Sequence, residues 1–227
     1  MNRLNSYKPE LKVPPENLLR KYSQDDAFVF LLRHGQTCGS ETKSFIGITD
    51  VDLDPTGILQ ASYWKQAFGP INLDAVYSSS LNRCDDTAQL IANGKKVIKT
   101  SALNEINMGS WDGQTFDRIK KDQPNEFKKR GHSIDIFKAP GGESFYDVSL
   151  RAIPFFNLCA NDIEKDMDME KGMRKGMGGK ILIVTHAGVI RVILCHILKL
   201  KLKELFQIKL SFGQLFVFKK FFKGENY

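Results

Sequence analysis

Two histidines follow two apolar runs that lie about 150 residues apart in the chain. Residues 28–32 are all apolar and lead into Arg33 and His34, and the β-branched run at 180–185 leads into His186. Continuous apolar runs are typical of strands buried in a parallel sheet, and ligands bind beyond the carboxyl ends of such strands. An imidazole there can act as a nucleophile, a base or a ligand, and an arginine offers a planar fork of donors for phosphate. We therefore expect a site that contains Arg33, His34 and His186.

A second arginine and a carboxylate lie between the two histidines. Residues 75–78 predict a short strand that runs into a Ser-rich turn and a helix, and Arg83 falls in the first turn of that helix. A helix N-terminus and a guanidinium both attract anions. Glu105 lies in a later loop of polar and glycine residues. Two arginines, two histidines and one glutamate at the ends of predicted elements indicate a site for a phosphate group.

These residues occur in motifs that resemble those of the histidine phosphatase superfamily. That family includes cofactor-dependent phosphoglycerate mutases, fructose-2,6-bisphosphatase domains and α-ribazole phosphatases. The resemblance extends from about Phe28 to Phe218, in family order, and is carried by residues 33–37, 45–53, 80–83, 105 with 109–113, 140–144 and 185–188. It implies an α/β fold, a three-layer α/β/α sandwich with a mostly parallel central sheet. It also implies catalytic roles for His34, Glu105 and His186, and phosphate binding by Arg33, Arg83 and Thr37.

The implied chemistry suits these residue types. To attack phosphorus, His34 must present an unprotonated ring nitrogen, and nearby Arg33 and Arg83 disfavour the imidazolium and lower its pKa. Phosphoryl transfer needs alignment and stabilisation of charge on the equatorial oxygens, which Arg33, Arg83 and His186 can supply without a metal or other cofactor. Gly35 is expected to let the backbone pass close to the histidine ring and fix its tautomer.

The leaving alkoxide needs a proton. One branch of the family carries an aspartate directly after the second histidine, where this chain has Ala187. Glu105 matches the position of the proton donor in the mutase-like branch, and we expect it to serve as the acid.

Departures from the family mutases favour hydrolysis over isomerisation. The mutases have an asparagine and a threonine where this chain has Ser40 and Ile46, and an arginine and a tyrosine where it has Ile106 and Met108. A buried site that lacks such donors discriminates against a carboxylated triose phosphate. We therefore expect a phosphatase for a small phosphorylated metabolite, with α-ribazole 5′-phosphate as the motif-based candidate. A cofactor-dependent phosphoglycerate mutase and a non-catalytic phosphate-binding relative stay open as alternatives.

Composition predicts one domain at residues 27–227, preceded by a polar N-terminal extension at 1–26 with a short helix at 15–22. No run approaches the ~18 apolar residues of a membrane span, and the first residues lack the apolar core of a signal peptide. Four cysteines without paired spacing indicate thiols and a cytoplasmic location. The net charge of +7 is scattered, so nucleic acid is not expected as a partner. The sequence is compatible with a homodimer but does not determine the oligomeric state.

Residue patterns also predict where the other elements lie. Helices are expected at 55–68, 81–92, 144–165 and 188–199, with a helical stretch at 113–130 broken by Pro124. A short strand is expected at 96–99. A loop is expected at 165–179. Residues 207–212 and 214–220 predict a strand pair that closes the sheet.

Overall fold

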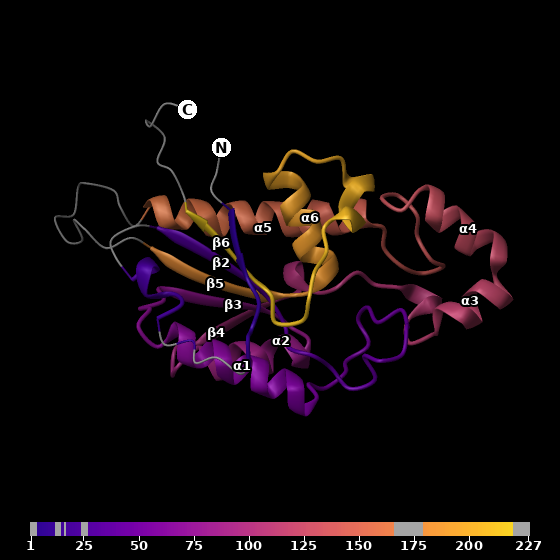
Figure 1. Cartoon of the computed structure of the whole chain (residues 1–227). Helices are drawn as coiled ribbons and strands as arrows, with labels where there is room; N and C mark the ends of the chain where they lie inside the picture. Colours follow the sequence, from indigo (N-terminus) through magenta and orange to yellow (C-terminus); the bar gives the residue numbers. More distant parts are fainter. Residues whose placement is uncertain (1–3, 12–14, 16, 24–26, 166–178, 220–227) are drawn as a thin grey trace.

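The computed structural model describes residues 4–11, 15, 17–23, 27–165 and 179–219, and its strands form one mixed sheet. The order across the sheet is β1-β6-β2-β5-β3-β4 (Figure 1). Strands β2, β5, β3 and β4 are parallel to one another, whereas β6 is antiparallel to both β2 and β1. The strands are β1 (Leu4–Tyr7), β2 (Phe28–Arg33), β3 (Ala75–Ser79), β4 (Val97–Thr100), β5 (Lys180–Thr185) and β6 (Leu215–Lys219).

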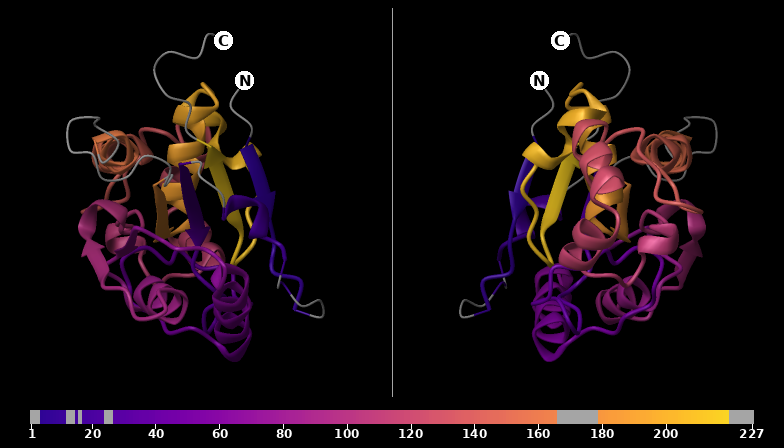
Figure 2. Two further views of the ribbon diagram at one scale, coloured as in Figure 1. Left: turned by 90° about the vertical axis from the view of Figure 1, so that its left-hand side faces the viewer. Right: turned by 90° about the vertical axis from the view of Figure 1, so that its right-hand side faces the viewer.

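Two helix layers cover the two faces of this sheet (Figures 1 and 2). Side chains of β2 alternate between the faces, as in any strand. Phe28, Phe30 and Leu32 pack with α1 (Pro55–Phe68) and α2 (Asn82–Ile91), and Val29 and Leu31 pack with α5 (Phe145–Lys165) and α6 (Ala187–Ile197). The three-layer α/β/α sandwich predicted from the sequence is therefore confirmed.

Helix α1 shows how local sequence sets an element that borders the site. The Asp54 carboxylate caps the helix by accepting a hydrogen bond from the Gly57 N–H at 2.7 Å, and Pro55 occupies the first turn. Both residue types are favoured at these positions. The helix ends at Phe68, so the predicted range 55–68 is confirmed.

A smaller apolar cluster lies beyond the sheet. It contains Phe45, Trp111, Ile119 and Ala139 and packs under α3 (Phe116–Asp122) and α4 (Pro124–His132). Figure 1 shows these two helices at the far right, past the ends of the strands. Pro124 starts α4, which explains the predicted break in this helical stretch.

Three predictions for the chain ends differ from the structure. Residues 207–212 are not a strand: the 3₁₀ helix η5 (Leu202–Gln207) is followed by a loop, and only β6 joins the sheet. Leu4–Tyr7 lies within the predicted N-terminal extension yet forms the edge strand β1, with Leu4 opposite Phe218. A short helix was predicted at 15–22, where the structure shows the 3₁₀ turn η1 (Arg20–Tyr22). Most of the predicted loop at 165–179 lies outside the described residues.

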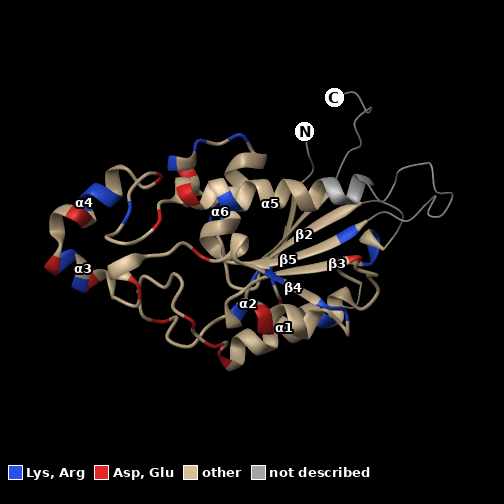
Figure 3. Ribbon diagram, turned by 180° about the vertical axis from the view of Figure 1, so that it is seen from behind, with Lys and Arg blue, Asp and Glu red and all other residues tan. Residues whose placement is uncertain are grey.

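The remaining predicted elements lie within a few residues of their observed bounds. Two short 3₁₀ turns that were not predicted, η2 (Ser101–Leu103) and η3 (Gly109–Trp111), lie on either side of Glu105 in its loop. Cys38 is exposed, whereas Cys84, Cys159 and Cys195 are buried. In the view of Figure 3, Lys and Arg are interspersed with Asp and Glu over α3, α4 and the neighbouring loops. No helix of the described residues is long and apolar enough to cross a membrane.

Candidate active site

The parallel pairing of β2 with β5 brings the two histidines together. Arg33 lies opposite Thr185 in the register, so the residues that follow them, His34 and His186, leave the sheet side by side. The N–H of His34 donates to the Thr185 carbonyl at 3.0 Å. The two imidazole rings lie with centroids 5.1 Å apart at an angle of 61°, and both are buried, with 5% and 0% of their surface exposed. The predicted convergence is thus present in the structure.

The His34 ring is held in one tautomer. Its Nδ1 lies 2.7 Å from the Gly35 carbonyl, which can only accept, so Nδ1 carries the proton and the Nε2 lone pair is free. Burial holds the pKa of His34 well below its usual value, and the charges of Arg33 and Arg83 lower it further. The imidazole is therefore neutral at physiological pH, which a nucleophile requires.

The prediction that the Gly35 backbone passes close to the His34 ring and fixes its tautomer is confirmed by this hydrogen bond. Glycine is also needed because a Cβ at this position would lie 2.5 Å from the carbonyl oxygen of Gly57, at the start of α1. The Gly35 N–H also donates to the Thr87 hydroxyl at 3.2 Å, which ties this turn to α2.

Arg33 is a partly buried cation at the end of β2. Its Nη1 donates to the Leu210 carbonyl at 3.3 Å, and its guanidinium carbon lies 3.8 Å from the centre of the Phe212 ring. Its Nε is buried and has no partner among the described residues. Burial lowers the pKa of Arg33 to about 10, partly offset by the charge of Glu105, so the side chain stays charged at neutral pH. A buried, unpaired N–H of this kind is suited to an incoming anion.

Arg83 holds the loop that follows β2. Its Nη2 donates to the Gly47 carbonyl at 2.7 Å, its Nη1 donates to the Thr49 carbonyl at 2.9 Å, and its Nε donates to His186 Nδ1 at 3.2 Å. Each terminal nitrogen has a second N–H, and Nη1 also lies 4.0 Å from the Asp50 carboxylate. The first N–H of α2 does not form the expected anion site, because the Asp50 carboxylate accepts it from Asn82 at 2.9 Å.

Asp112 holds the same loop from the other side. Its carboxylate accepts hydrogen bonds from the N–H groups of Gly47, Ile48 and Thr49 at 3.0, 2.8 and 3.3 Å. Residues 47–49 are therefore fixed through their N–H groups by Asp112, and Arg83 binds the carbonyls of Gly47 and Thr49. Asp112 lies in the sequence motif at 109–113, but the sequence did not predict a role for it.

Glu105 is buried beside the N-terminus of α6. Its Oε2 accepts from the Gly188 N–H at 3.0 Å and its Oε1 accepts from its own neighbour Ile106 at 2.9 Å. A Cβ at residue 188 would collide with this carboxylate, so a larger residue there would displace the Glu105 side chain. The charge of Glu105 acts on Arg33 and on Arg191, which places it in the electrostatic neighbourhood of the site.

An ion pair that the sequence did not predict supports the Glu105 loop. Arg151 of α5 donates to the carbonyls of Asn104 and Glu105 at 2.7 and 3.2 Å and forms a two-pronged pair with the Glu143 carboxylate at 3.0 Å. Glu143 in turn accepts from the Asn107 N–H at 2.9 Å. The sequence signal that could have indicated this ion pair is the Pro-Gly-Gly-Glu-Ser motif at 140–144, because it contains Glu143.

Thr37 does not join this network. It is buried, and its backbone pairs with Leu53 in an isolated bridge. Within the described ranges, no hydrogen bond links Thr37 to either arginine or either histidine of the site. The phosphate-binding role predicted for Thr37 therefore stays a prediction.

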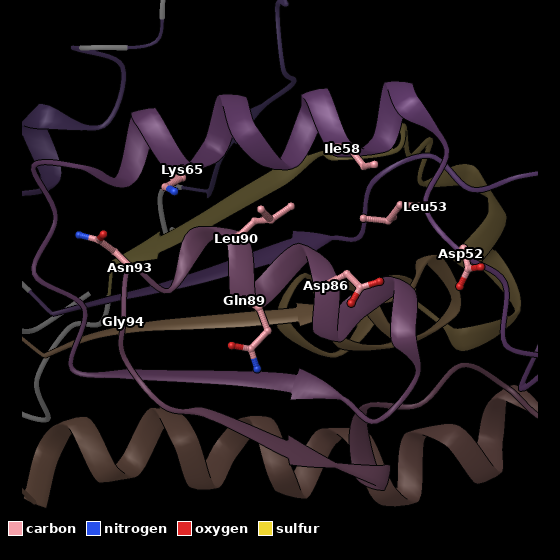
Figure 4. A pocket seen from close by; sticks show the side chains of 9 residues that line it. All are labelled: Asp52, Leu53, Ile58, Lys65, Asp86, Gln89, Leu90, Asn93 and Gly94. Atoms are coloured by element: carbon pink, nitrogen blue, oxygen red, sulfur yellow. The ribbon is translucent and has the colours of Figure 1, made fainter.

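One cavity of about 600 Å³ lies elsewhere, between α1 and α2. Figure 4 shows the residues that line it, among them Leu53, Ile58, Lys65 and Asp86. None of the predicted site residues lines this cavity. In the part of the chain that the structure describes, no three His, Cys, Asp or Glu side chains gather closely enough to hold a metal ion.

Comparison with known proteins decides the family. The model of the histidine phosphatase superfamily (branch 1) matches residues 29–220, which include His34, Arg83, Glu105 and His186. The chain belongs to the histidine phosphatase superfamily. It is an enzyme of the histidine phosphatase type, as the sequence motifs indicated.

Curated relatives of this histidine phosphatase carry several activities in their names. A fructose-2,6-bisphosphatase of Saccharomyces cerevisiae is 29% identical over 78% of this chain, but the match spans only 35% of that protein's length. Other relatives are named as 2,3-bisphosphoglycerate-dependent phosphoglycerate mutases and as phosphoserine phosphatases.

Solved structures support the same fold. A mycobacterial glucosyl-3-phosphoglycerate phosphatase has a TM-score of 0.69 and 25% identity, covering 84% of this chain and 89% of the other. An α-ribazole phosphatase from Shigella flexneri has a TM-score of 0.71, with 82% and 87% of the two chains covered. At 21% identity, this second likeness shows the fold alone.

Proposed function

We propose that this histidine phosphatase hydrolyses a small phosphorylated metabolite through a phosphohistidine at His34. One observation carries the proposal: the ring donates its Nδ1 proton to the Gly35 carbonyl, and its Nε2 lone pair is left free in a buried, cationic site. The unpaired Nε of Arg33 is available in the same site for a phosphate oxygen.

The reaction takes place in two steps. His34 Nε2 attacks phosphorus, an N–P bond forms, and the bond to the leaving alcohol breaks while Glu105 gives the departing oxygen a proton. Water then attacks phosphorus and passes a proton back to Glu105, the N–P bond breaks, and inorganic phosphate leaves. Arg33 and Arg83 stabilise the charge on the equatorial oxygens in both steps, so the chemistry needs alignment and donors rather than a metal.

The mutase alternative is less well supported by the residues that would bind a phosphoglycerate. Ile106 stands where the family mutases have an arginine, and its side chain is buried in the core with 4% exposed. Ile46 and Met108 offer no strong donors. A carboxylate on the substrate would therefore lack the groups that orient it in a mutase.

The covalent intermediate gives the direct test. Enzyme that is rapidly quenched during turnover of a ³²P-labelled monoester should carry an acid-labile phosphate, and His34→Ala should carry none. His132→Ala, which removes an exposed histidine of α4, is the matched control and should be labelled like the wild type. Wild-type activity in His34→Ala would refute the mechanism.

The substrate is narrowed by screening phosphorylated metabolites for phosphate release. α-Ribazole 5′-phosphate belongs in this panel because the sequence motifs at 45–50 and 140–144 resemble those of α-ribazole phosphatases. Preference for it should appear as a kcat/KM at least about tenfold above that for small sugar phosphates, which corresponds to roughly 1.4 kcal/mol in transition-state binding. Equal rates on all monoesters would leave the phosphatase proposal standing and remove this refinement.

A further inference from the structure

A hydrogen-bond chain leads from a backbone N–H to the second histidine. Asn104 Oδ1 lies 2.8 Å from the N–H of Ser80. A backbone N–H can only donate, so the side-chain atom that faces it must be the carbonyl oxygen of the amide. The same oxygen lies 2.8 Å from the Ser79 hydroxyl, which must donate to it. The orientation of Asn104 is thus determined by the main chain.

The hydrogen bonds of Ser79 determine which ring nitrogen of His186 carries the proton. A serine hydroxyl has one proton, and here that proton is given to Asn104. The hydroxyl oxygen also accepts from the Leu81 N–H at 3.2 Å. Toward His186 Nε2, which lies 2.7 Å away, it can therefore only accept. It follows that His186 Nε2 carries a proton.

The contact at His186 Nδ1 gives the same tautomer independently. Arg83 Nε lies 3.2 Å from His186 Nδ1, and an arginine N–H can only donate, so Nδ1 must present a lone pair. Burial holds the pKa of His186 well below its usual value, and the charges of Arg83, His34, Arg33 and Arg151 lower it further, so the ring is neutral with a single proton. The buried Cys84 thiol also touches the ring, 3.3 Å from Nε2, and burial raises its pKa so that it stays protonated. A thiol is a weak partner in either direction and does not set the tautomer.

We propose that Ser79 and Asn104 are positioning residues that hold His186 as the neutral tautomer with its proton on Nε2 and the Nδ1 lone pair on Arg83. The neutral ring then donates its single proton in the hydrogen bond to Ser79. Its Nδ1 lone pair fixes the direction of the Arg83 guanidinium, whose remaining N–H groups bind the anion. This inference deepens the proposed function and rests on it only for the role of Arg83.

The tautomer can be read without any substrate. The ring nitrogens of His186, assigned in ¹⁵N-labelled protein by comparison with His186→Gln, should show a protonated Nε2 and an unprotonated Nδ1 between about pH 6 and pH 8. The opposite tautomer in the wild type would overturn the proposal. Loss of phosphatase activity plays no part in this readout, so failure of the proposed function is recognised separately.

Variants then test the two positioning residues. Ser79→Ala and Asn104→Leu should each populate the Nδ1–H form and lower kcat on a preferred monoester about tenfold. Ser79→Thr, which keeps the hydroxyl, should restore the tautomer. Ser149→Ala and Asn157→Leu, at a partly buried and an exposed position of α5, are matched controls and should leave the spectrum and the rate unchanged.

Asn104→Asp keeps both acceptor contacts and should keep the tautomer, while its negative charge should move the acid limb of the pH profile to higher pH. This variant also covers the case in which Asn104→Leu does not fold. An unchanged tautomer in folded Ser79→Ala, or an unchanged pH profile in Asn104→Asp, would refute the positioning role.

Discussion

The guanidinium of Arg33 lies over the ring of Phe212, with its carbon 3.8 Å from the ring centre. The same ring lies 5.7 Å from that of His34. Phe212 belongs to the loop between η5 and β6. In the same loop, the Leu210 carbonyl accepts a hydrogen bond from Arg33, and the Gly213 N–H donates to the His34 carbonyl at 3.0 Å. One loop near the C-terminus therefore positions both residues that end β2.

Replacing Phe212 should weaken phosphate binding without unfolding the protein. Phe212→Leu removes a cation–π contact worth about 1 to 2 kcal/mol, which corresponds to a loss of phosphate affinity on the order of tenfold. The inhibition constant of inorganic phosphate and the KM for p-nitrophenyl phosphate measure this directly. Phe206→Leu is the control, because that ring contacts Arg130 and Arg191 instead. Unchanged phosphate inhibition in Phe212→Leu would show that the stacking does not position Arg33.

The sequence predicts the site best where regular structure decides it. Two apolar strands that pair in parallel, each followed by a histidine, must bring those histidines to one edge of the sheet. This is why His34 and His186 could be placed before the structure was known. The α1 range could also be predicted, because Asp54 and Pro55 are strong local signals.

Loops carry the parts that could not be predicted. Phe212 reaches Arg33 through a loop whose path depends on where β6 joins the sheet, and residues 207–212 read as a strand from their alternation alone. Asp112 contacts Gly47, which lies 65 residues away in the chain, and Arg151 contacts Asn104, which lies 47 residues away. Such long-range contacts are made by tertiary packing and leave no periodic signal in the local sequence.

Loss of the Asp112 carboxylate should disturb the site through Arg83. In Asp112→Ala, the N–H groups of residues 47–49 lose their shared acceptor, and the carbonyls that hold Arg83 become mobile. Because Ile48 and Thr49 are exposed, water can replace part of the contact, and we expect a loss of about 1 to 3 kcal/mol in unfolding free energy. The value of kcat/KM should fall more than tenfold. Denaturant unfolding and steady-state kinetics measure the two effects.

Asp122→Ala is the control for this change. It removes an exposed carboxylate of α3 that pairs with Arg118 at 3.5 Å. Surface ion pairs of this kind contribute little, so both quantities should stay close to the wild type. An Asp112→Ala enzyme with normal kcat/KM would mean that the loop does not orient Arg83.

The buried histidines should make the fold sensitive to acid. His34 and His186 have pKa values well below 6.5 in the folded protein, so below about pH 6.5 the unfolded chain binds more protons than the folded one. The unfolding free energy should therefore fall as the pH is lowered, by up to about 1.4 kcal/mol per pH unit for each histidine. Urea unfolding at pH 7.5, 6.5 and 5.5 should show this slope, and His186→Gln should reduce it. An identical slope in His186→Gln would contradict the linkage.

Glu105→Gln should slow substrates according to their leaving group. An alkyl phosphate needs a proton on the departing oxygen, whereas p-nitrophenyl phosphate has a good leaving group that needs little help. We expect a much larger loss of kcat on the alkyl ester. The ratio of the two losses is the informative quantity, because glutamine also gives up one of the contacts to the N–H groups of Ile106 and Gly188, and that structural loss affects both substrates alike. Equal losses would assign Glu105 a structural role.

Isomerisation of phosphoglycerates separates the phosphatase from its nearest alternative. A mutase must keep the intermediate bound while it turns, so it needs donors for the carboxylate, whereas a phosphatase releases an alcohol and admits water. Ile46 is more than one-third exposed but has no donor, and the side chain of Ile106 is buried. In an enolase-coupled assay primed with 2,3-bisphosphoglycerate, interconversion of 2- and 3-phosphoglycerate should be at least about a hundredfold slower than hydrolysis of a preferred monoester, a difference of roughly 2.7 kcal/mol in barrier height. Rapid isomerisation that depends on the primer and disappears in His34→Ala would assign the enzyme to the mutases instead.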